Sequence, residues 1–434
     1  MPPVPPAEPF ARDLLAFISA SPSPFHAVAE AARRLDATGF VRLAERDDWS
    51  AQVGPRYLVR GGSLVAWVTG PEHGPTTAFG VVGAHTDSPN LRVKPQPDTG
   101  RVGWRQLGVE VYGGVLLNSW LDRDLGLSGR VVVRDATADE GIATRLVHVD
   151  RPLLRIPQLA IHLDRNVNTS GLELNPQAHL APVWGTGPVD EGGFARFLAE
   201  EVGVAPGEVL SWEAMLHDLT PPTALGLDGS LLAAPRIDNL LSCHSAIEAV
   251  AGTVSGPRPV VPVVCLFDHE EVGSQSATGA DSSILPTVLE RITAILGGHR
   301  DEWHRALAGS WCVSTDGAHA THPNYAERHE PDHLVAIGGG PVLKVNANVR
   351  YATDAPGAAR VVVAAERAGV PLQRFVTRTD MPCGSTIGPV TAARLGIPTV
   401  DVGVAQLSMH SARELCGASD PARLHRLLTA LLTG

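Results

Sequence analysis

The 434-residue sequence has few of the features that mark secreted or membrane proteins. It contains only five cysteines, an odd number, and no Cys-x-x-Cys pair. That pattern argues against a disulfide framework and is typical of a reducing compartment. No apolar run approaches the roughly 20 residues that span a bilayer, and the N-terminus lacks the basic and apolar regions of a signal peptide. We therefore expect a cytoplasmic protein.

Positive charge is also scarce. Lys and Arg number 35 against 46 Asp and Glu, which gives a formal net charge of −11. Such a chain is a poor partner for nucleic acid or an anionic membrane surface, so neither is expected to bind it. Hydrophobic residues make up 44% and charged residues 19%, a globular composition. At about 150 residues per domain, the length allows two to three domains and a sizeable core.

Three common catalytic motifs are missing from the sequence. There is no G-x-S-x-G elbow of a serine hydrolase and no P-loop. The glycines at 338–340 lead into a proline and a strand-like run rather than a helix, so they do not form a dinucleotide fingerprint. The chemistry must therefore be sought in other side chains.

Secondary-structure patterns indicate an α/β fold. Residues 10–35 have helical periodicity with a break at 21–24, and strand-like runs follow, the last of them a continuous apolar run over 79–84. Beyond residue 233, apolar strands alternate with helices. The helices are expected at 237–250, 285–296 and 356–368, and the strands near 260–267, 310–315 and 398–404.

The stretch between these two parts has a different texture. Residues 92–232 contain alternating or β-branched runs separated by glycines, which predicts an antiparallel, hairpin-rich module. The pattern becomes irregular and proline-rich over 182–222. We therefore predict a discontinuous α/β domain, a central β-sheet flanked by helices, over 1–91 and 233–434. A β-rich domain over 92–232 is inserted into it.

Acidic and histidine residues follow several of the apolar strands. His85 and Asp87 end one run, Glu270 and Glu271 follow a second, and Asp316 follows a third. Open α/β sheets bind ligands beyond the carboxyl ends of their strands. Carboxylates gathered there repel one another unless a cation neutralises them. This set of oxygen and nitrogen donors therefore predicts a metal site.

Each of these motifs has an alternative interpretation. Asp87 could hold the second ring nitrogen of a ligating His85, or it could only cap a turn. One member of the pair Glu270 and Glu271 could bind metal while the other acts as a base toward a metal-activated water. Alternatively, both are solvated loop acids.

Two further candidates and one turn are ambiguous by themselves. Asp238 begins a predicted helix, where Asp is a common N-cap, although its carboxylate could also bridge two metal ions. His410 follows an apolar strand, where a packed or exposed histidine is commoner than a ligand. The segment 381–386, MPCGST, offers small residues and backbone donors that could cradle a substrate, or it is only a turn.

Eight blocks in a fixed order make the pattern specific. From about residue 10 to the C-terminus, the chain resembles the M18 metallopeptidases, the aspartyl aminopeptidase family. The blocks are GAHTDSPNLRVKP, IHLDRNVN, PRIDNLLSCHSA, FDHEEVGSQSATGA, TDGAHATHPNY, KVNANVRYAT, MPCGSTIGP and LSMHSARE.

The resemblance implies two zinc ions per subunit, with Mn²⁺ or Co²⁺ also acceptable to such ligands. It assigns His85 and Asp316 to one ion, Glu271 and His410 to the other, and Asp238 as the bridge. It also makes Glu270 the base and then the acid, with Asp87 orienting His85. The inserted domain of the family supports dimers, which assemble into a dodecamer. His162 on that domain would reach a neighbouring subunit's site and stabilise the tetrahedral intermediate.

The family removes N-terminal Asp or Glu from peptides. Burial of an unpaired carboxylate is costly, so a cation must select such a side chain. Lys344 is the first candidate and Arg350 the second, although Lys344 could equally be a strand residue with a solvated head. Gly384, Ser385 and Thr386 would line the substrate pocket.

Two other functions remain open from the sequence. A metallo-aminopeptidase that prefers neutral N-terminal residues would need the same fold and ligands. A self-assembling shell or binding protein with a vestigial metal site would form a large particle without turnover.

Overall fold

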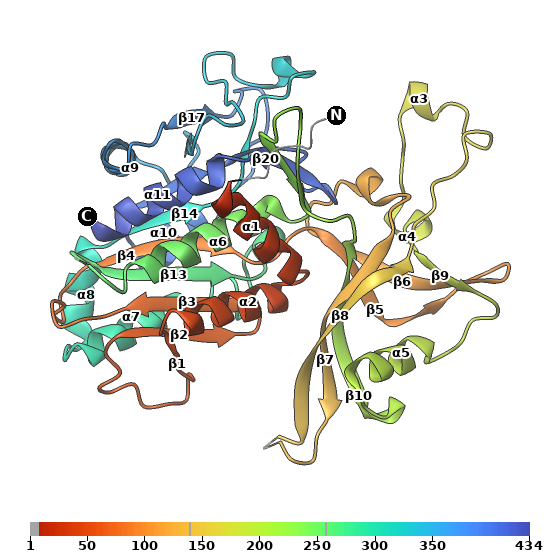
Figure 1. Cartoon of the computed structure of the whole chain (residues 1–434), viewed down its shortest axis with the longest axis horizontal. Helices are drawn as coiled ribbons and strands as arrows, with labels where there is room; N and C mark the ends of the chain where they lie inside the picture. Colours follow the sequence, from red (N-terminus) through yellow and green to blue (C-terminus); the bar gives the residue numbers. More distant parts are fainter. Residues whose placement is uncertain (1–7, 139, 257) are drawn as a thin grey trace. The chain divides into compact units, whose positions relative to one another are not determined.

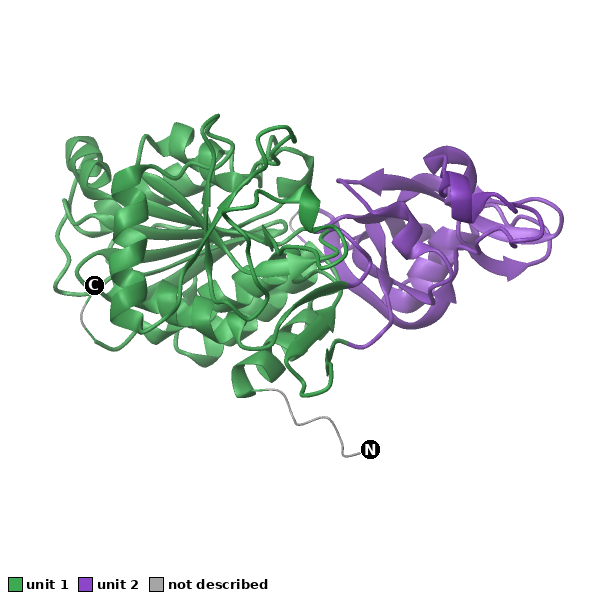
Figure 2. Ribbon diagram, turned by 90° about the horizontal axis from the view of Figure 1, so that it is seen from above, with its two compact units in different colours: residues 1–87, 222–409, 414–434 green, residues 88–221, 410–413 purple. Residues whose placement is uncertain are grey.

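The computed structural model describes residues 8–138, 140–256 and 258–434, and the chain forms two compact units. Unit 1 comprises Met1–Asp87, Pro222–Met409 and Glu414–Gly434, and unit 2 comprises Ser88–Pro221 and His410–Arg413 (Figure 2). The boundary expected after residue 91 lies four residues later than the one after Asp87, and the boundary expected after residue 232 lies eleven residues later than the one after Pro221. Residues 410–413, expected in the catalytic domain, group with unit 2.

A nine-stranded mixed sheet forms the centre of unit 1, in the order β1-β2-β3-β13-β4-β14-β18-β16-β17 (Figure 1). The neighbours β13, β4 and β14 are parallel, so their carboxyl ends lie at one edge of the sheet. The strands are β1 Val41–Arg42, β2 Pro55–Arg60, β3 Ser63–Val68, β4 Phe79–His85, β13 Val261–Phe267, β14 Trp311–Thr315, β16 Val342–Val345, β17 Gln373–Val376 and β18 Thr399–Gly403.

Helices cover both faces of this sheet, as the expected α/β class requires. Because successive strand residues point to opposite faces, Val82 packs into one apolar cluster and Val81 into another. Five helices bury their apolar sides in the first cluster: α1 Pro9–Ala20, α2 Pro24–Ala37, α6 Ile237–Gly252, α9 Ala355–Ala368 and α11 Asp420–Thr433. Three bury theirs in the second: α7 Ile284–Ile295, α8 Arg300–Gly309 and α10 Ile387–Leu395.

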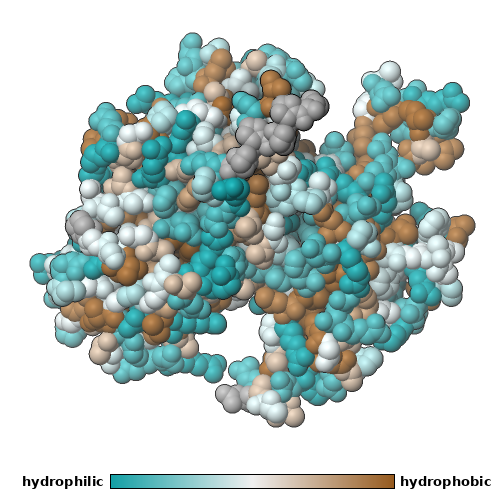
Figure 3. Space-filling model, viewed as in Figure 1, coloured by the Kyte–Doolittle hydropathy of each residue, from teal (hydrophilic) through white to brown (hydrophobic). Residues whose placement is uncertain are grey.

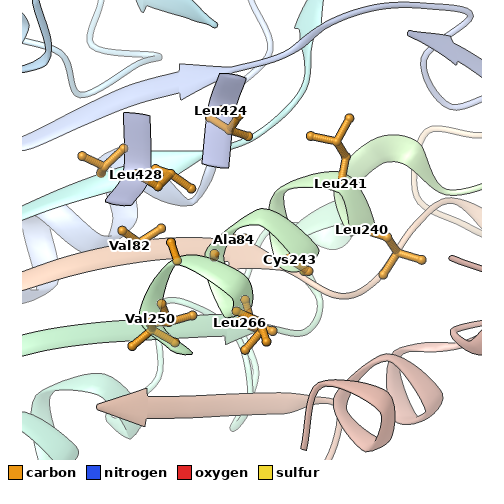
Figure 4. Packing of buried hydrophobic residues seen from close by; sticks show 14 of the residues in the cluster. Val82, Ala84, Leu240, Leu241, Cys243, Val250, Leu266, Leu424 and Leu428 are labelled. Carbon is orange, nitrogen blue, oxygen red and sulfur yellow. The ribbon is translucent and has the colours of Figure 1, made fainter. Parts of the chain in front are cut away.

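Helix α6 is the central helix of the first cluster. Its residue Cys243 lies beside Ala84 of β4, and its residue Leu240 belongs to the same cluster, to which α11 contributes Leu424 and Leu428 (Figure 4). Nearly all of α6 is buried, which is why its apolar residues are not confined to one stripe. This packing fixes the N-terminal end of α6 beside the carboxyl end of β4.

A second, smaller sheet of unit 1 has the order β11-β12-β20-β19-β15. Strand β11 and the first half of β12 fall within the range expected for the insertion, but β12 pairs with β20 from the C-terminal part, and β11 pairs with β12. The bounds are β11 Thr223–Leu225, β12 Leu231–Ala234, β15 Ala318–His319, β19 Ala405–Leu407 and β20 Glu414–Gly417.

Unit 2 is built on a six-stranded antiparallel sheet in the order β8-β7-β10-β5-β6-β9. The hairpin-rich texture expected from the sequence is therefore present. The strands are β5 Asn90–Thr99, β6 Trp104–Tyr112, β7 Leu125–Arg134, β8 Ile142–Leu154, β9 Val183–Thr186 and β10 Val209–Asp218, and the helices are α3 Val167–Ser170, α4 Pro176–His179 and α5 Gly193–Val202.

The expectation of irregular structure over 182–222 was wrong. Helix α5 buries Phe194 and Leu198 against the sheet and ends at Gly203 in the left-handed conformation. Strand β10 lies between β5 and β7. The prolines that suggested irregular structure lie between these elements rather than inside them.

The helices expected at 10–35, 237–250, 285–296 and 356–368 are all present to within a few residues. Figure 3 shows hydrophilic and hydrophobic residues interspersed over the face in view. Among the described residues, none of the helices is long and apolar enough to cross a membrane.

Candidate metal centre

The carboxyl ends of β13, β4 and β14 bring acidic and histidine side chains together. His85 is the last residue of β4, and Asp316 directly follows β14. Glu270 and Glu271 lie in the short 3₁₀ helix Glu270–Val272 after β13. Asp238 comes from the first turn of α6. The sequence patterns alone did not reveal that these three strands are neighbours.

The His85 imidazole lies at the centre of this cluster. Its Nε2 is 3.3 Å from Oδ1 of Asp238 and 3.5 Å from Oδ1 of Asp316. All three side chains are buried, and one ligand atom of each lies within 4.8 Å of the others. Carboxylate oxygens and an imidazole nitrogen at such spacing suit a divalent ion such as zinc.

The ring orientation of His85 supports a cation at this position. Nδ1 is 3.0 Å from the backbone carbonyl of Asp87, which can only accept, so Nδ1 carries the hydrogen. A neutral ring therefore presents the lone pair of Nε2 to two carboxylates. That arrangement is repulsive unless a proton or a metal ion lies between them.

Asp87 positions the two glutamates as well as His85. Its fully buried carboxylate accepts the backbone N–H groups of Glu270 and Glu271, each at 3.1 Å, and lies 3.4 Å from Nδ1 of His85. Ligand atoms of His85, Glu270 and Glu271 also lie within 4.8 Å of one another. Asp87 therefore connects the end of β4 to the turn after β13.

The pKa shifts at the site reflect crowded negative charge. Burial, followed by the charges of Asp316 and neighbouring carboxylates, raises the pKa of Glu270 to about 8. Burial lowers the pKa of His85, but hydrogen bonds to Asp238, Asp316 and Asp87 outweigh it and raise that pKa well above its usual value. A bound cation would relieve both effects.

Lys344 on β16 reaches the same cluster. It is 1% exposed, and Nζ lies 3.8 Å from Oδ2 of Asp316 while donating to the carbonyl of Gly317 at 3.0 Å. The ammonium also lies 5.0 Å from the centre of the Tyr351 ring. The solvated head that was the alternative for Lys344 is therefore excluded.

The other expected substrate-binding residues lie on two adjoining loops. Arg350 is exposed, and its Nε donates to the carbonyl of Cys383 at 3.2 Å. Ser385 donates to the carbonyl of Arg350, and Gly384 is exposed beside it. Thr386 caps α10 through an N–H of that helix. These contacts bring residues 350 and 383–386 together.

Two expected site residues belong to unit 2. His410 lies in the segment His410–Arg413, where its Nδ1 is 2.9 Å from the carbonyl of Gly114. His162 is exposed, between β8 and α3. The roles expected for both remain predictions.

Two buried acids were missed by the sequence interpretation. Asp401 on β18 lies opposite Lys344 and accepts from Thr386 at 2.5 Å and from the N–H of Ala352 at 2.6 Å. Glu414 on β20 accepts the N–H of Asp238 at 2.8 Å. An aspartate within the apolar run PTVDVGV was the available signal for the first, whereas nothing local marked the second.

Comparison with known proteins agrees with the ordered blocks. The profile of the family described as "Aminopeptidase I zinc metalloprotease (M18)" matches residues 17–431. The chain is 57% identical to the "Probable M18 family aminopeptidase 2" of Streptomyces coelicolor, over 97% of this chain and 96% of that protein.

Solved structures share the fold. A chain in the "Cryo-EM structure of the Ape4 and Nbr1 complex" superposes with a TM-score of 0.93 at 37% identity, over 98% of this chain and 85% of that one. A chain in the structure of the S. cerevisiae mApe1 dodecamer gives 0.84 at 29% identity, over 97% and 96%. The chain therefore belongs to the M18 peptidases, a family of zinc metalloaminopeptidases.

Proposed function

We propose that this chain is a dinuclear zinc aminopeptidase that removes Asp or Glu from the N-terminus of peptides. The observation that carries the proposal is the buried contact of His85 with Asp238 and Asp316, beside Glu270 and Glu271. Buried carboxylates and an imidazole held this close need a compensating positive charge, either a proton or a metal ion.

The proposed ligand set consists of four donors of this cluster and of His410 from unit 2. His85 and Asp316 would hold one ion, Glu271 and His410 would hold the other, and Asp238 would be the ligand shared by both. Nδ1 of His410 contacts the Gly114 carbonyl, so Nε2 is the nitrogen proposed to bind metal. When bound, the two ions supply Lewis acidity toward the scissile carbonyl and lower the pKa of a water.

Glu270 is the proposed general base. Asp87 accepts the backbone N–H of Glu270, as it does that of Glu271, and these hydrogen bonds fix the turn. Ligand atoms of both glutamates lie within 4.8 Å of one of His85. The raised pKa of Glu270 in the absence of cations falls once positive charge is present, so the carboxylate is ionised when needed. Glu270 then accepts a proton from the attacking water and passes it to the leaving amine.

Lys344 and Arg350 are the residues proposed to recognise the acidic side chain of the substrate's N-terminal residue. The chain has two lysines in all, Lys94 and Lys344, and the second is buried at the cluster. Its Nζ already lies near Asp316 and the Gly317 carbonyl, so a substrate carboxylate must share it. Arg350 is exposed beside Ser385 and could supply the remaining charge.

Because Lys344 already lies close to Asp316, a second candidate function is kept, an aminopeptidase that prefers neutral N-terminal residues. If the ammonium only neutralises the cluster, the site would prefer neutral N-terminal residues. Relative turnover of Asp, Glu, Leu and Ala p-nitroanilides distinguishes the two, and preference for Leu would contradict the acidic assignment.

Self-association into dimers and then a dodecamer is proposed by analogy with the S. cerevisiae neighbour, whose title describes a dodecamer. Apolar side chains flank His162: Leu159, Ile161 and Leu163 are 57%, 47% and 75% exposed. An exposed apolar loop of this kind is typical of a contact with another molecule. It supports the role of His162 at a neighbouring subunit's active site.

One experiment tests the central proposal. Metal content per chain is measured beside hydrolysis of an Asp-amide substrate, before and after treatment with a chelator and after return of Zn²⁺. Activity should disappear with the metal and return with it. A large particle with metal but without turnover would instead indicate a binding protein. Light scattering on the same sample, with His162→Ala as a variant, separates assembly from catalysis.

A further inference from the structure

The sheet of unit 2 carries a second group of metal-ligand side chains, and none of its members belongs to the centre described above. The group consists of His148 and Asp150 on β8 and His217 on β10. One ligand atom from each residue lies within 4.8 Å of the other two.

The strand register explains why these three side chains meet. Strand β7 lies between β8 and β10, with its residue Ser128 opposite His148 and its residue Gly126 opposite His217. His148 and Asp150 are two residues apart and share one face of the sheet. The intervening Val149 and the neighbour Leu216 point into the apolar core on the other face. All three donors therefore project from the face opposite that core.

His217 is held in a defined orientation. It is 4% exposed, and its Nδ1 lies 3.2 Å from the hydroxyl of Ser128, which is fully buried. A contact of this kind to one ring nitrogen is what usually orients a ligating histidine so that the other nitrogen binds the metal.

Gly126 makes the space that the ring occupies. A Cβ at this position would lie 2.6 Å from Nε2 of His217, too close for any side chain. Nε2 therefore lies above the middle strand, between β10 and β8, on the side from which His148 and Asp150 approach. The imidazole rings of His148 and His217 have centroids 5.4 Å apart. A glycine within a strand often marks such a close approach.

We propose that His148, Asp150 and His217 form a third metal site, for a divalent ion of the zinc class. Two imidazoles and one carboxylate suit Zn²⁺, Co²⁺ or Ni²⁺ and leave a position for water. Asp150 also lines an open depression of about 860 Å³ in unit 2. An ion can therefore reach the Asp150 carboxylate from solvent. This proposal goes beyond the proposed function, because none of the three residues is assigned to the catalytic centre.

Metal counting tests the proposal on the full-length protein. Wild type, His148→Ala and Asp150→Asn are equilibrated with Zn²⁺, freed of unbound metal and analysed for zinc per chain. Each variant should bind about one ion fewer than wild type, since three ligands form the site. Hydrolysis of the Asp-amide should stay within twofold of wild type. His304→Ala, which removes an exposed histidine from α8, is the matched control and should lose no ion.

Equal zinc content in wild type and His148→Ala would overturn the proposal. The closeness of His148 and Asp150 would then be a contact that binds no metal. A combined loss of zinc and activity would also overturn it, because the missing ion would then belong to the catalytic centre.

A direct measurement removes any dependence on variant folding. Crystals of wild type soaked in Co²⁺ should give an anomalous peak about 2.0–2.1 Å from a ring nitrogen of His148 and of His217. Cobalt at the His85 centre with no peak at this position would refute the site.

Discussion

Lys344 on β16 and Asp401 on β18 lie opposite each other in antiparallel register, and both side chains are buried. Burial raises the pKa of Asp401, while the charge of Lys344 lowers it in part. Asp401 also accepts from the hydroxyl of Thr386 and the N–H of Ala352. One buried carboxylate therefore connects the candidate specificity lysine to both candidate substrate-binding loops.

Removal of the Asp401 carboxylate should destabilise the protein. In Asp401→Ala, the Ala352 N–H and the Thr386 hydroxyl lose their acceptor. The loss should cost about 1–3 kcal/mol for the buried hydroxyl and less for the partly buried N–H. Asp401→Asn keeps an acceptor oxygen and should lose less. Urea unfolding of the zinc-loaded variants measures the difference, and equal losses would show that these hydrogen bonds contribute little.

The two adjacent glutamates should respond differently to substitution. Glu270→Gln should lower kcat by about 10²–10⁴-fold, the usual contribution of a general base, with zinc content unchanged. Glu271→Gln should lose zinc, because it removes a proposed ligand. Zinc analysis beside kcat for each variant separates the roles. A near-normal rate for Glu270→Gln would show that the base is another residue.

Glu270 should also make the metal-free protein sensitive to pH. Its pKa is about 8 in the metal-free fold against 4.5 as the ordinary value, so folding favours the protonated acid. That contribution to stability is fully present below the unfolded pKa and is lost as pH rises towards 8. Metal-free Glu270→Gln, which stays neutral, should therefore have a higher Tm than metal-free wild type at pH 8.

The Tm difference between metal-free Glu270→Gln and metal-free wild type should shrink as pH falls to about 5, where Glu270 is protonated in the folded wild type. Zinc should shrink it as well, because cations offset the neighbouring carboxylates. Thermal unfolding across this pH range, with and without zinc, is the measurement. A constant Tm difference at all pH values would mean that Glu270 does not titrate as inferred.

Lys344→Met should reduce kcat/KM for Asp substrates by at least about tenfold, or 1.4 kcal/mol, and should change Leu substrates much less. Arg350→Met should have a smaller effect in the same direction. Lys94→Met, which removes the other lysine of the chain, is the control. If Lys344→Met loses zinc and affects all substrates alike, the ammonium neutralises Asp316 rather than selecting the substrate.

The sequence predicted a metal site because its candidate ligands follow apolar strands, a local pattern. Apolar texture also identified β4 and β13 as buried strands. It could not reveal that β13 and β14 flank β4, because strand order is a long-range property. That order is what turns three separate motifs into one cluster around His85.

Other features of the structure left little or no local signal. Glu414 contacts Asp238 only because β20 and β12 pair, although they are distant in the sequence. Helix α5 was hidden by its proline-rich flanks. The grouping of 410–413 with unit 2 rests on contacts to distant residues, such as those of Ala412 with Ser119 and of Arg413 with Thr220.

The strand order also has a consequence for synthesis on the ribosome. Strands β3 and β4 are neighbours in the sequence, but β13 lies between them in the sheet. All of Ser88–Pro221 must be translated before β13 emerges. In the nascent chain, the edges of β3 and β4 that will pair with β13 therefore stay unpaired while the inserted unit is translated. The inserted unit can fold during this time. Such exposed apolar strands are where a chaperone would be expected to bind the growing polypeptide.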